Sequence, residues 1–296
     1  MYLNRNYADT SSNQSKALRR PARGPARRST CAMLALCLAM LSSACAQVPP
    51  AAEESYKPTP GQVGKDSVWV PSPPAVVEHM LDIAKVTRED FVMDLGSGDG
   101  RNVIAAGKRG ARAVGVEFNP DLVGLSNRNA ARQGVADRAS FVQGDMFAAD
   151  ISQATVLALF LLTDNLRRLT PKFLDMKPGS RIVVNYFGID GWRPDFEEEM
   201  KADCEPWCVI KFYIVPAKVA GKWRLADGVL ELEQRFQEVF GGYTVNGVKT
   251  DITNARMDGE RIRFGIGGVQ YAGRVLGNRM QGERSGGASG AWTAQR

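Results

Sequence analysis

The 296-residue sequence is poor in the side chains that metal and nucleophile sites need, with one histidine and five cysteines. The histidine, His79, lies between Glu78 and Met80 in a helical pattern, where we expect a surface or packing role. A single imidazole excludes a multi-histidine metal centre and a Ser-His-Asp triad as the main chemistry. Outside the first 46 residues only Cys204 and Cys208 remain, too few to hold zinc. We therefore predict no metal site.

The N-terminal region lacks an apolar run long enough to span a bilayer. Its apolar stretch, Cys31 to Leu41, follows a basic segment and precedes a group of small residues. This layout is typical of a secretory signal peptide. We predict a signal peptide at residues 1–46, cleavage before Gln47, and export to the periplasm. Cys45 also resembles the cysteine of a lipoprotein box, but the leucine sits one position too early, which favours simple cleavage over lipid anchoring.

Outside that segment the chain also lacks an excess of positive charge. The formal net charge is +6, yet residues 1–46 alone hold seven basic residues and one acidic residue. The remaining chain is therefore neutral overall. A basic surface of the kind that binds nucleic acid is not implied, and we expect no nucleic-acid partner.

A glycine-rich turn is the most informative feature that is present. Residues 91–101, FVMDLGSGDGR, predict a strand that runs into a turn and then a helix. Arg101 stands where the dinucleotide fingerprint requires a third glycine, and the Gly-Lys-Ser/Thr of a phosphate loop is absent. An acid, Asp94, instead precedes the first glycine by two residues.

This D-x-G-x-G-x-G pattern resembles motif I of the class I S-adenosylmethionine (SAM) methyltransferases. A second predicted strand ends in Glu117, at about the spacing of an acid that binds a ribose diol. A third, residues 139–143, is followed by Asp145, which the resemblance assigns to the adenine amino group. We predict SAM as the cofactor. The predicted cofactor-binding residues are Asp94, Gly96, Ser97, Gly98, Asp99, Gly100, Glu117, Phe118, Asp145 and Met146.

Strands alternate with helices along residues 69–215, which predicts an α/β fold with a doubly wound, Rossmann-like methyltransferase sheet. Residues 47–68 have the composition of a linker or extended arm. From residue 216 turn signals recur at short intervals, and we predict a small antiparallel all-β domain at 216–296. The later elements of the first domain are expected as strands at 155–161, 181–187 and 210–215 and a helix at 166–176 that Pro171 shortens or kinks.

Three segments together resemble one methyltransferase branch: Trp69 to Pro73, residues 94–101, and Gly115 to Pro120. They are similar to the mitochondrial ATP-synthase c-subunit lysine methyltransferases and their bacterial relatives, and more distantly to the non-SET histone-lysine methyltransferases. Trp69 replaces the more usual tyrosine. The resemblance implies a protein substrate and methylation of a lysine side chain.

Methyl transfer to an amine requires a neutral nucleophile held in line and away from water. Side chains that follow the fourth and fifth predicted strands are the candidates for this role. We select Asn165, Asn185 and Tyr186 as candidate catalytic residues, with Trp69 and Trp192 as possible walls for an aliphatic stem.

Three questions stay open from the sequence. Cys204 and Cys208 can form a disulfide in an oxidising compartment or remain two thiols. The all-β domain can be a structural module or bind a partner in the cell envelope. The whole protein can be an exported enzyme, or a non-catalytic ligand-binding or interaction protein on a methyltransferase fold.

Overall fold

The computed structural model describes residues 56–201, 203–287 and 289–296. The predicted signal peptide, its cleavage site and residues 47–55 of the predicted linker lie outside these ranges. No helix in the described part is both long and apolar enough to cross a membrane. The described residues belong to one compact unit.

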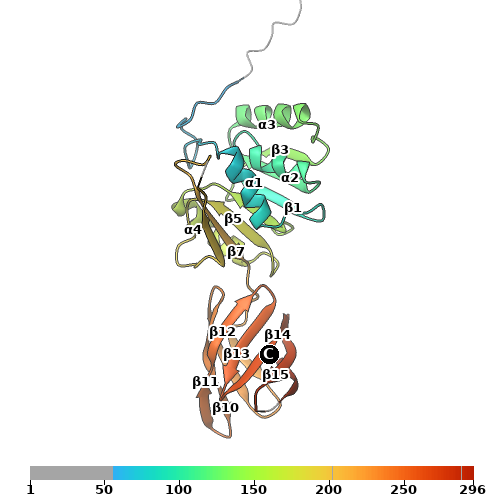
Figure 1. Cartoon of the computed structure of the whole chain (residues 1–296), viewed down its shortest axis with the longest axis vertical. Helices are drawn as coiled ribbons and strands as arrows, with labels where there is room; N and C mark the ends of the chain where they lie inside the picture. The colour runs from blue at the N-terminus through green and yellow to red at the C-terminus, as the bar shows by residue number, and fades with distance from the viewer. Residues whose placement is uncertain (1–55, 202, 288) are drawn as a thin grey trace, which may run out of the picture. The chain divides into compact units, whose positions relative to one another are not determined.

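The first sheet has seven strands in the order β3-β2-β1-β4-β5-β7-β6 (Figure 1). Strands β1 to β5 are mutually parallel, and β7 runs antiparallel to both β5 and β6. The strands are β1 (Phe91–Leu95), β2 (Arg112–Glu117), β3 (Ala139–Gln143), β4 (Val156–Leu159), β5 (Arg181–Asn185), β6 (Phe196–Glu199) and β7 (Val209–Ile214). The predicted α/β class and doubly wound sheet are confirmed.

Helices cover both faces of this sheet because its central strands are apolar on both sides. The helices are α1 (Pro74–Ile83), α2 (Arg101–Lys108), α3 (Pro120–Arg132) and α4 (Thr163–Leu174). Consecutive residues of β1 belong to two separate cores. Val92 packs in the core that contains residues of α1, α2 and α3, whereas Met93 packs in the core that contains residues of α4. The period-two alternation of a strand thus divides the apolar side chains between two layers.

Two elements differ from the sequence prediction. Helix α4 begins three residues earlier than expected, continues past Pro171 and ends at Leu174, two residues before the expected end. Strand β6 was not predicted, because its sequence Phe-Glu-Glu-Glu lacks apolar alternation. It is an edge strand, where charged side chains protect the unpaired edge from association with other chains.

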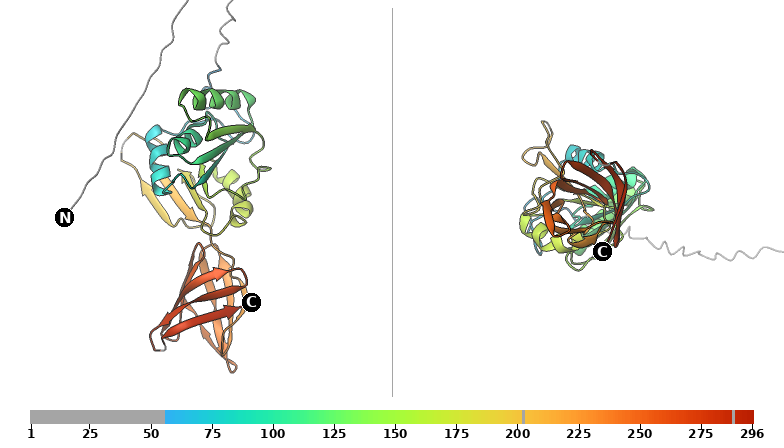
Figure 2. Two further views of the ribbon diagram at one scale, coloured as in Figure 1. Left: turned by 90° about the vertical axis from the view of Figure 1, so that its right-hand side faces the viewer. Right: turned by 90° about the horizontal axis from the view of Figure 1, so that it is seen from below.

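The second sheet contains nine antiparallel strands, β8 to β16, and closes on itself through an additional pairing of β9 with β10 (Figure 2). Trp223, Phe264, Tyr271 and Trp292 lie in its core, with Phe264 and Tyr271 stacked at 4.9 Å between ring centroids. The strands are β8 (Gly221–Arg224), β9 (Val229–Arg235), β10 (Glu238–Val245), β11 (Val248–Asp251), β12 (Thr253–Asp258), β13 (Arg261–Ile266), β14 (Val269–Leu276), β15 (Arg279–Ser285) and β16 (Gly290–Gln295). The predicted antiparallel all-β region is confirmed.

Trp192 packs against aromatic side chains instead of lining a ligand site. It is 2% exposed, stacks on Phe236 at 5.0 Å between centroids, and meets Tyr213 edge-on. Asp195, three residues further along the chain, forms an ion pair with Arg256 of β12 at 2.6 Å. The expectation that Trp192 walls an aliphatic stem is therefore wrong, since its surface is already covered.

The loop between β6 and β7 contains a disulfide between Cys204 and Cys208, whose Cα atoms are 4.8 Å apart. The structure thus selects the disulfide from the two alternatives that the sequence left open. Cys204 is buried, and both cysteines pack against the core on the α1 side of the sheet.

Candidate functional site

The glycine-rich turn lies between β1 and α2 and requires glycine at three positions. Gly96, Gly98 and Gly100 have φ angles of 77°, 57° and 85°, in the left-handed region that other residues seldom adopt. A Cβ atom on Gly98 would lie 2.6 Å from Nε1 of Trp69, so close packing also excludes a side chain there. The turn therefore brings bare backbone to the surface of a pocket.

Neighbouring elements hold this turn in place. The backbone N–H groups of Gly96 and Ser97 both donate to the carbonyl of Val116, at 2.7 and 3.1 Å. From α3, the hydroxyl of Ser126 donates to the carbonyl of Gly98 at 2.8 Å, and Asn129 donates to that of Asp99 at 2.9 Å. The turn is consequently preorganised by contacts with β2 and α3.

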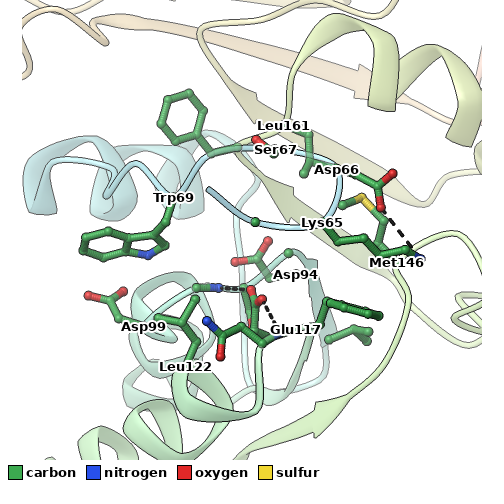
Figure 3. Close-up of a pocket in the computed structure, with 18 of the residues that line it drawn as sticks. Lys65, Asp66, Ser67, Trp69, Asp94, Asp99, Glu117, Leu122, Met146 and Leu161 are labelled. Carbon is green, nitrogen blue, oxygen red and sulfur yellow. Dashed lines mark hydrogen bonds and ion pairs between the residues drawn. The ribbon is translucent and has the colours of Figure 1, made fainter. Parts of the chain in front are cut away.

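Glu117 ends β2 directly beside the turn. One of its carboxylate oxygens accepts from the N–H of Gly98 and the other from the N–H of Asn119, each at 2.9 Å. Figure 3 shows these two bonds holding the carboxylate at the pocket wall. Each carboxylate oxygen has a further lone pair, so the group can still accept hydrogen bonds from a ligand diol.

Asp94 is the most unusual group of the site, since it is 3% exposed. Nδ2 of Asn102 donates to its carboxylate at 3.0 Å. Burial raises the pKa of Asp94 well above its usual range; the Asn102 hydrogen bond opposes this shift, and the charges of Glu117 and Asp99 add to it. Among the described residues no lysine or arginine forms an ion pair with Asp94. A buried carboxylate in this setting suits a cationic ligand.

Asp145 follows β3 at the other end of the pocket. Its carboxylate accepts from the backbone N–H of Phe147 at 2.8 Å and pairs with Nζ of Lys65 at 2.6 Å. The Lys65 hydrogen bond lowers the pKa of Asp145, which is therefore ionised at neutral pH. The Lys65 ammonium also lies 4.8 Å from the ring centroid of Phe118.

These groups surround a cavity of about 480 Å³, within the size range of small-molecule sites. One wall is the carboxyl edge of the sheet, with Asp94, Glu117 and Met146. The opposite wall is the segment 62–72, which includes Lys65 and Trp69 (Figure 3). Residues 62–68 of this wall fall in the predicted linker, because their sequence has no periodic pattern that indicates a binding role, whereas Trp69 is one of the two residues expected as a wall.

All ten predicted cofactor residues except Gly100 line this cavity. The three candidate catalytic residues do not. Asn165 donates to the carbonyl of Asp66 at 3.2 Å, and Asn185 is fully buried and donates to the hydroxyl of Ser72 at 3.3 Å. Tyr186 is 40% exposed. The two asparagines thus support the wall segment from behind, and a catalytic role for all three stays a prediction.

The mainly parallel sheet, the glycine turn and the acids at the carboxyl ends of β1, β2 and β3 define a SAM-dependent methyltransferase of the Rossmann-like class. A family model described as the ANTKMT methyltransferase domain matches residues 94–196. A protein-lysine N-methyltransferase of Saccharolobus islandicus (strain REY15A) is 47% identical over 129 residues, covering 43% of this chain and 80% of that protein. The chain belongs to this methyltransferase family.

Other relatives match a similar region. The ATP synthase c-subunit lysine N-methyltransferase of Homo sapiens is 34% identical over 131 residues, covering 43% of this chain and 56% of that protein. The chain thus spans just over half the length of that relative. A solved structure described as an RNA methyltransferase from Salinibacter ruber in complex with S-adenosyl-L-homocysteine is 43% identical, with a TM-score of 0.47, over 51% of this chain and 96% of that chain.

Proposed function

We propose that this protein is a SAM-dependent protein-lysine N-methyltransferase. The observation that carries the proposal is the buried carboxylate of Asp94, which lies in a preorganised pocket beside a glycine turn and has no cationic partner among the described residues. SAM has a cationic amino group and a cationic sulfur. The relatives named for lysine methylation supply the acceptor class.

The chain's own residues can hold each part of SAM. Asp94 would bind the amino group, which offsets the cost of burying its charge. Glu117 would accept from the ribose hydroxyls. Asp145 would accept from the adenine amino group, with Met146 and Phe118 beside the ring. The ammonium of Lys65 donates a hydrogen bond to the carboxylate of Asp145. Adenine binding therefore requires this ammonium to move away or to share the carboxylate with the adenine amino group.

When bound, SAM supplies a methyl group on cationic sulfur; the lysine nitrogen forms the C–N bond as the C–S bond breaks, and the electron pair stays on sulfur. The amine must lose its proton to water before it can attack. Burial away from water favours the neutral amine. The protein therefore contributes orientation and desolvation more than acid–base chemistry.

The test begins with residues 47–296, purified and titrated with SAM and S-adenosylhomocysteine (SAH) in a calorimeter. The protein is then incubated with SAM and an envelope-protein extract, and peptides are analysed by mass spectrometry. The expected result is saturable SAM binding and methyl groups on lysine. Binding without any methylated lysine, or methyl groups confined to other side chains or to nucleic acid, would contradict the lysine assignment.

We also propose that the enzyme is exported to the periplasm. The secretory layout of residues 1–46 supports this proposal, and so does the Cys204–Cys208 disulfide, because disulfides persist chiefly in oxidising compartments. A fusion of residues 1–46 to a reporter that works only outside the cytoplasm should be active. An inactive fusion, together with an uncleaved N-terminus on the native protein, would refute export.

A further inference from the structure

Four aromatic side chains gather just beyond the cofactor pocket. Trp207 meets Phe160 edge-on at 5.3 Å and Tyr186 edge-on at 5.1 Å between ring centroids. Phe187 lies 6.1 Å from Phe160, 6.1 Å from Trp207 and 5.2 Å from Tyr186. We call these four residues the aromatic cluster. They come from three separate segments: the end of β4, the end of β5 and the loop between β6 and β7.

The position of the cluster relative to the pocket follows from the order of the strands. Glu117 and Asp145, the groups suited to adenosine, lie at the carboxyl ends of β2 and β3. The order β3-β2-β1-β4-β5 places β4 and β5 on the opposite side of β1. Phe160 belongs to both the pocket lining and the cluster, so the two are continuous. The cluster therefore lies at the end of the pocket away from the adenosine groups.

The cluster is also open to solvent, unlike a closed core. Tyr186 is 40% exposed, and the other three rings are only partly buried. Tyr186 has a φ angle of 63°, while its N–H donates to the carbonyl of Val209 at 2.6 Å. A bulky residue in the left-handed region is strained, and such outliers concentrate at functional sites.

We propose that the aromatic cluster is the acceptor site of this enzyme, which takes the lysine side chain with its stem against the rings and its nitrogen toward the pocket. This inference depends on the proposed function and identifies the residues that recognise its substrate. Aromatic faces pack well on an aliphatic stem and attract a cationic nitrogen, both in the incoming lysine and in the methylated product.

The disulfide positions Trp207 within this site. Trp207 directly precedes Cys208, and the backbone N–H of Trp207 donates to the carbonyl of Cys204 at 2.7 Å. The N–H of Met200 donates to the carbonyl of Cys208 at 2.8 Å, which closes the loop at the end of the β6–β7 pair. Reduction by a dithiol, itself oxidised to a disulfide, would return two thiols and release this loop. Acceptor binding, but not cofactor binding, thus depends on the oxidised disulfide.

The test compares three ligands by calorimetry. The first is SAH, and the other two are analogues of SAH in which nitrogen replaces sulfur and bears a side chain. One side chain is 2-(butylamino)ethyl, which places a cationic nitrogen and a butyl stem where lysine would lie. The other is the equally long, uncharged heptyl group. We expect the wild type to bind the cationic analogue about tenfold more tightly than SAH, and the heptyl analogue less tightly than the cationic one.

Variants assign this gain to the cluster. Trp207→Ala should lose the tenfold gain and keep SAH affinity, whereas Trp207→Phe should retain most of it. Phe240→Ala is the matched control, because it removes an aromatic ring of a residue that is 53% exposed on β10. It should change neither the tenfold gain nor the SAH affinity. A dithiol reductant should abolish the gain in the wild type and have no further effect on Cys204→Ser/Cys208→Ser. Melting curves verify that every variant is folded.

The outcomes separate this inference from the proposed function. A wild type that does not bind SAH would overturn both. A gain that survives Trp207→Ala and reduction would overturn the acceptor site and leave lysine methylation standing. Equal affinity for the heptyl and cationic analogues would overturn a lysine-binding cluster, even if Trp207→Ala weakens both. A parallel loss of SAH affinity in Trp207→Ala would show that Trp207 belongs to the cofactor site, which also refutes the proposal.

Discussion

Replacement of Asp94 by asparagine should weaken cofactor binding while it stabilises the ligand-free protein. Asparagine preserves the size of the side chain, and its amide oxygen can still accept the hydrogen bond from Asn102. The charge that would meet the ligand's amino group is lost. A hydrogen bond to a charged group contributes about 1.5–3 kcal/mol, so SAM and SAH should both bind roughly 10- to 150-fold more weakly.

The stability of the ligand-free protein should change in the opposite direction. Burial raises the pKa of Asp94, which means that the folded protein holds this proton more tightly than the unfolded chain does. The wild type therefore loses stability as the pH rises above the unfolded pKa of about 3.9, until the raised folded pKa is passed. Asparagine does not titrate. The melting temperature of Asp94→Asn should exceed that of the wild type at neutral pH, and the difference should shrink as the pH is lowered.

The assay is a pair of measurements on each protein: the Kd for SAH by calorimetry, and melting temperatures without ligand across the acid-to-neutral range. Asp137→Asn is the control, because it removes the same charge from a side chain that is 68% exposed outside the pocket. It should change neither property. If Asp94→Asn binds SAH as tightly as the wild type, or if its melting temperature falls at neutral pH, the reasoning about the buried carboxylate is wrong.

Three further predictions concern the same pocket. Glu117→Ala should weaken SAM binding by about 1–3 kcal/mol, since it removes a charged acceptor; an unchanged Kd in a folded variant would contradict the ribose assignment. Gly98→Ala should cost more stability and affinity than Gly134→Ala: both have positive φ, but only at Gly98 would the Cβ meet Trp69, at 2.6 Å. Equal melting temperatures would refute the steric argument. A chain ended near Val215, checked by a cooperative melt, should bind SAM within about tenfold of the full protein, or about 1.4 kcal/mol by calorimetry.

Much of the cofactor pocket could be predicted because its residues lie close together in sequence and depend on local rules. Gly96, Gly98 and Gly100 mark a turn that only glycine tolerates. Glu117 ends one strand and Asp145 follows the next, and parallel strands bring their carboxyl ends to one edge. Sequence spacing is therefore enough to gather these groups around one ligand.

The remaining parts depend on long-range contacts that leave no periodic signal. Lys65 reaches Asp145 across eighty positions of sequence, and Asn165 binds Asp66 across ninety-nine. Two strands, β5 and β6, separate Phe160 from Trp207 in the sequence, although the two rings are in contact. Neither β6 nor the loop that contains Trp207 has apolar alternation. The opposite wall of the pocket and the aromatic cluster could consequently be found only from the folded chain.

Buried polar atoms without hydrogen-bond partners lower the stability of the ligand-free pocket. Ser97 Oγ and Asn102 Oδ1 are buried without a hydrogen-bond partner among the described residues, and both belong to residues that line the same cavity as Asp94. Each unsatisfied buried polar group costs about 1–3 kcal/mol. Other buried polar atoms without a partner, in Asn185, Trp192 and Arg284, belong to residues outside this cavity, so a polar ligand that enters it can relieve only the cost at Ser97 and Asn102. A ligand at 100 times its Kd stabilises the folded state by about 2.7 kcal/mol through mass action. The fold therefore holds the pocket open at the expense of ligand-free stability, and β2 and α3 keep the turn in the binding conformation before the ligand arrives.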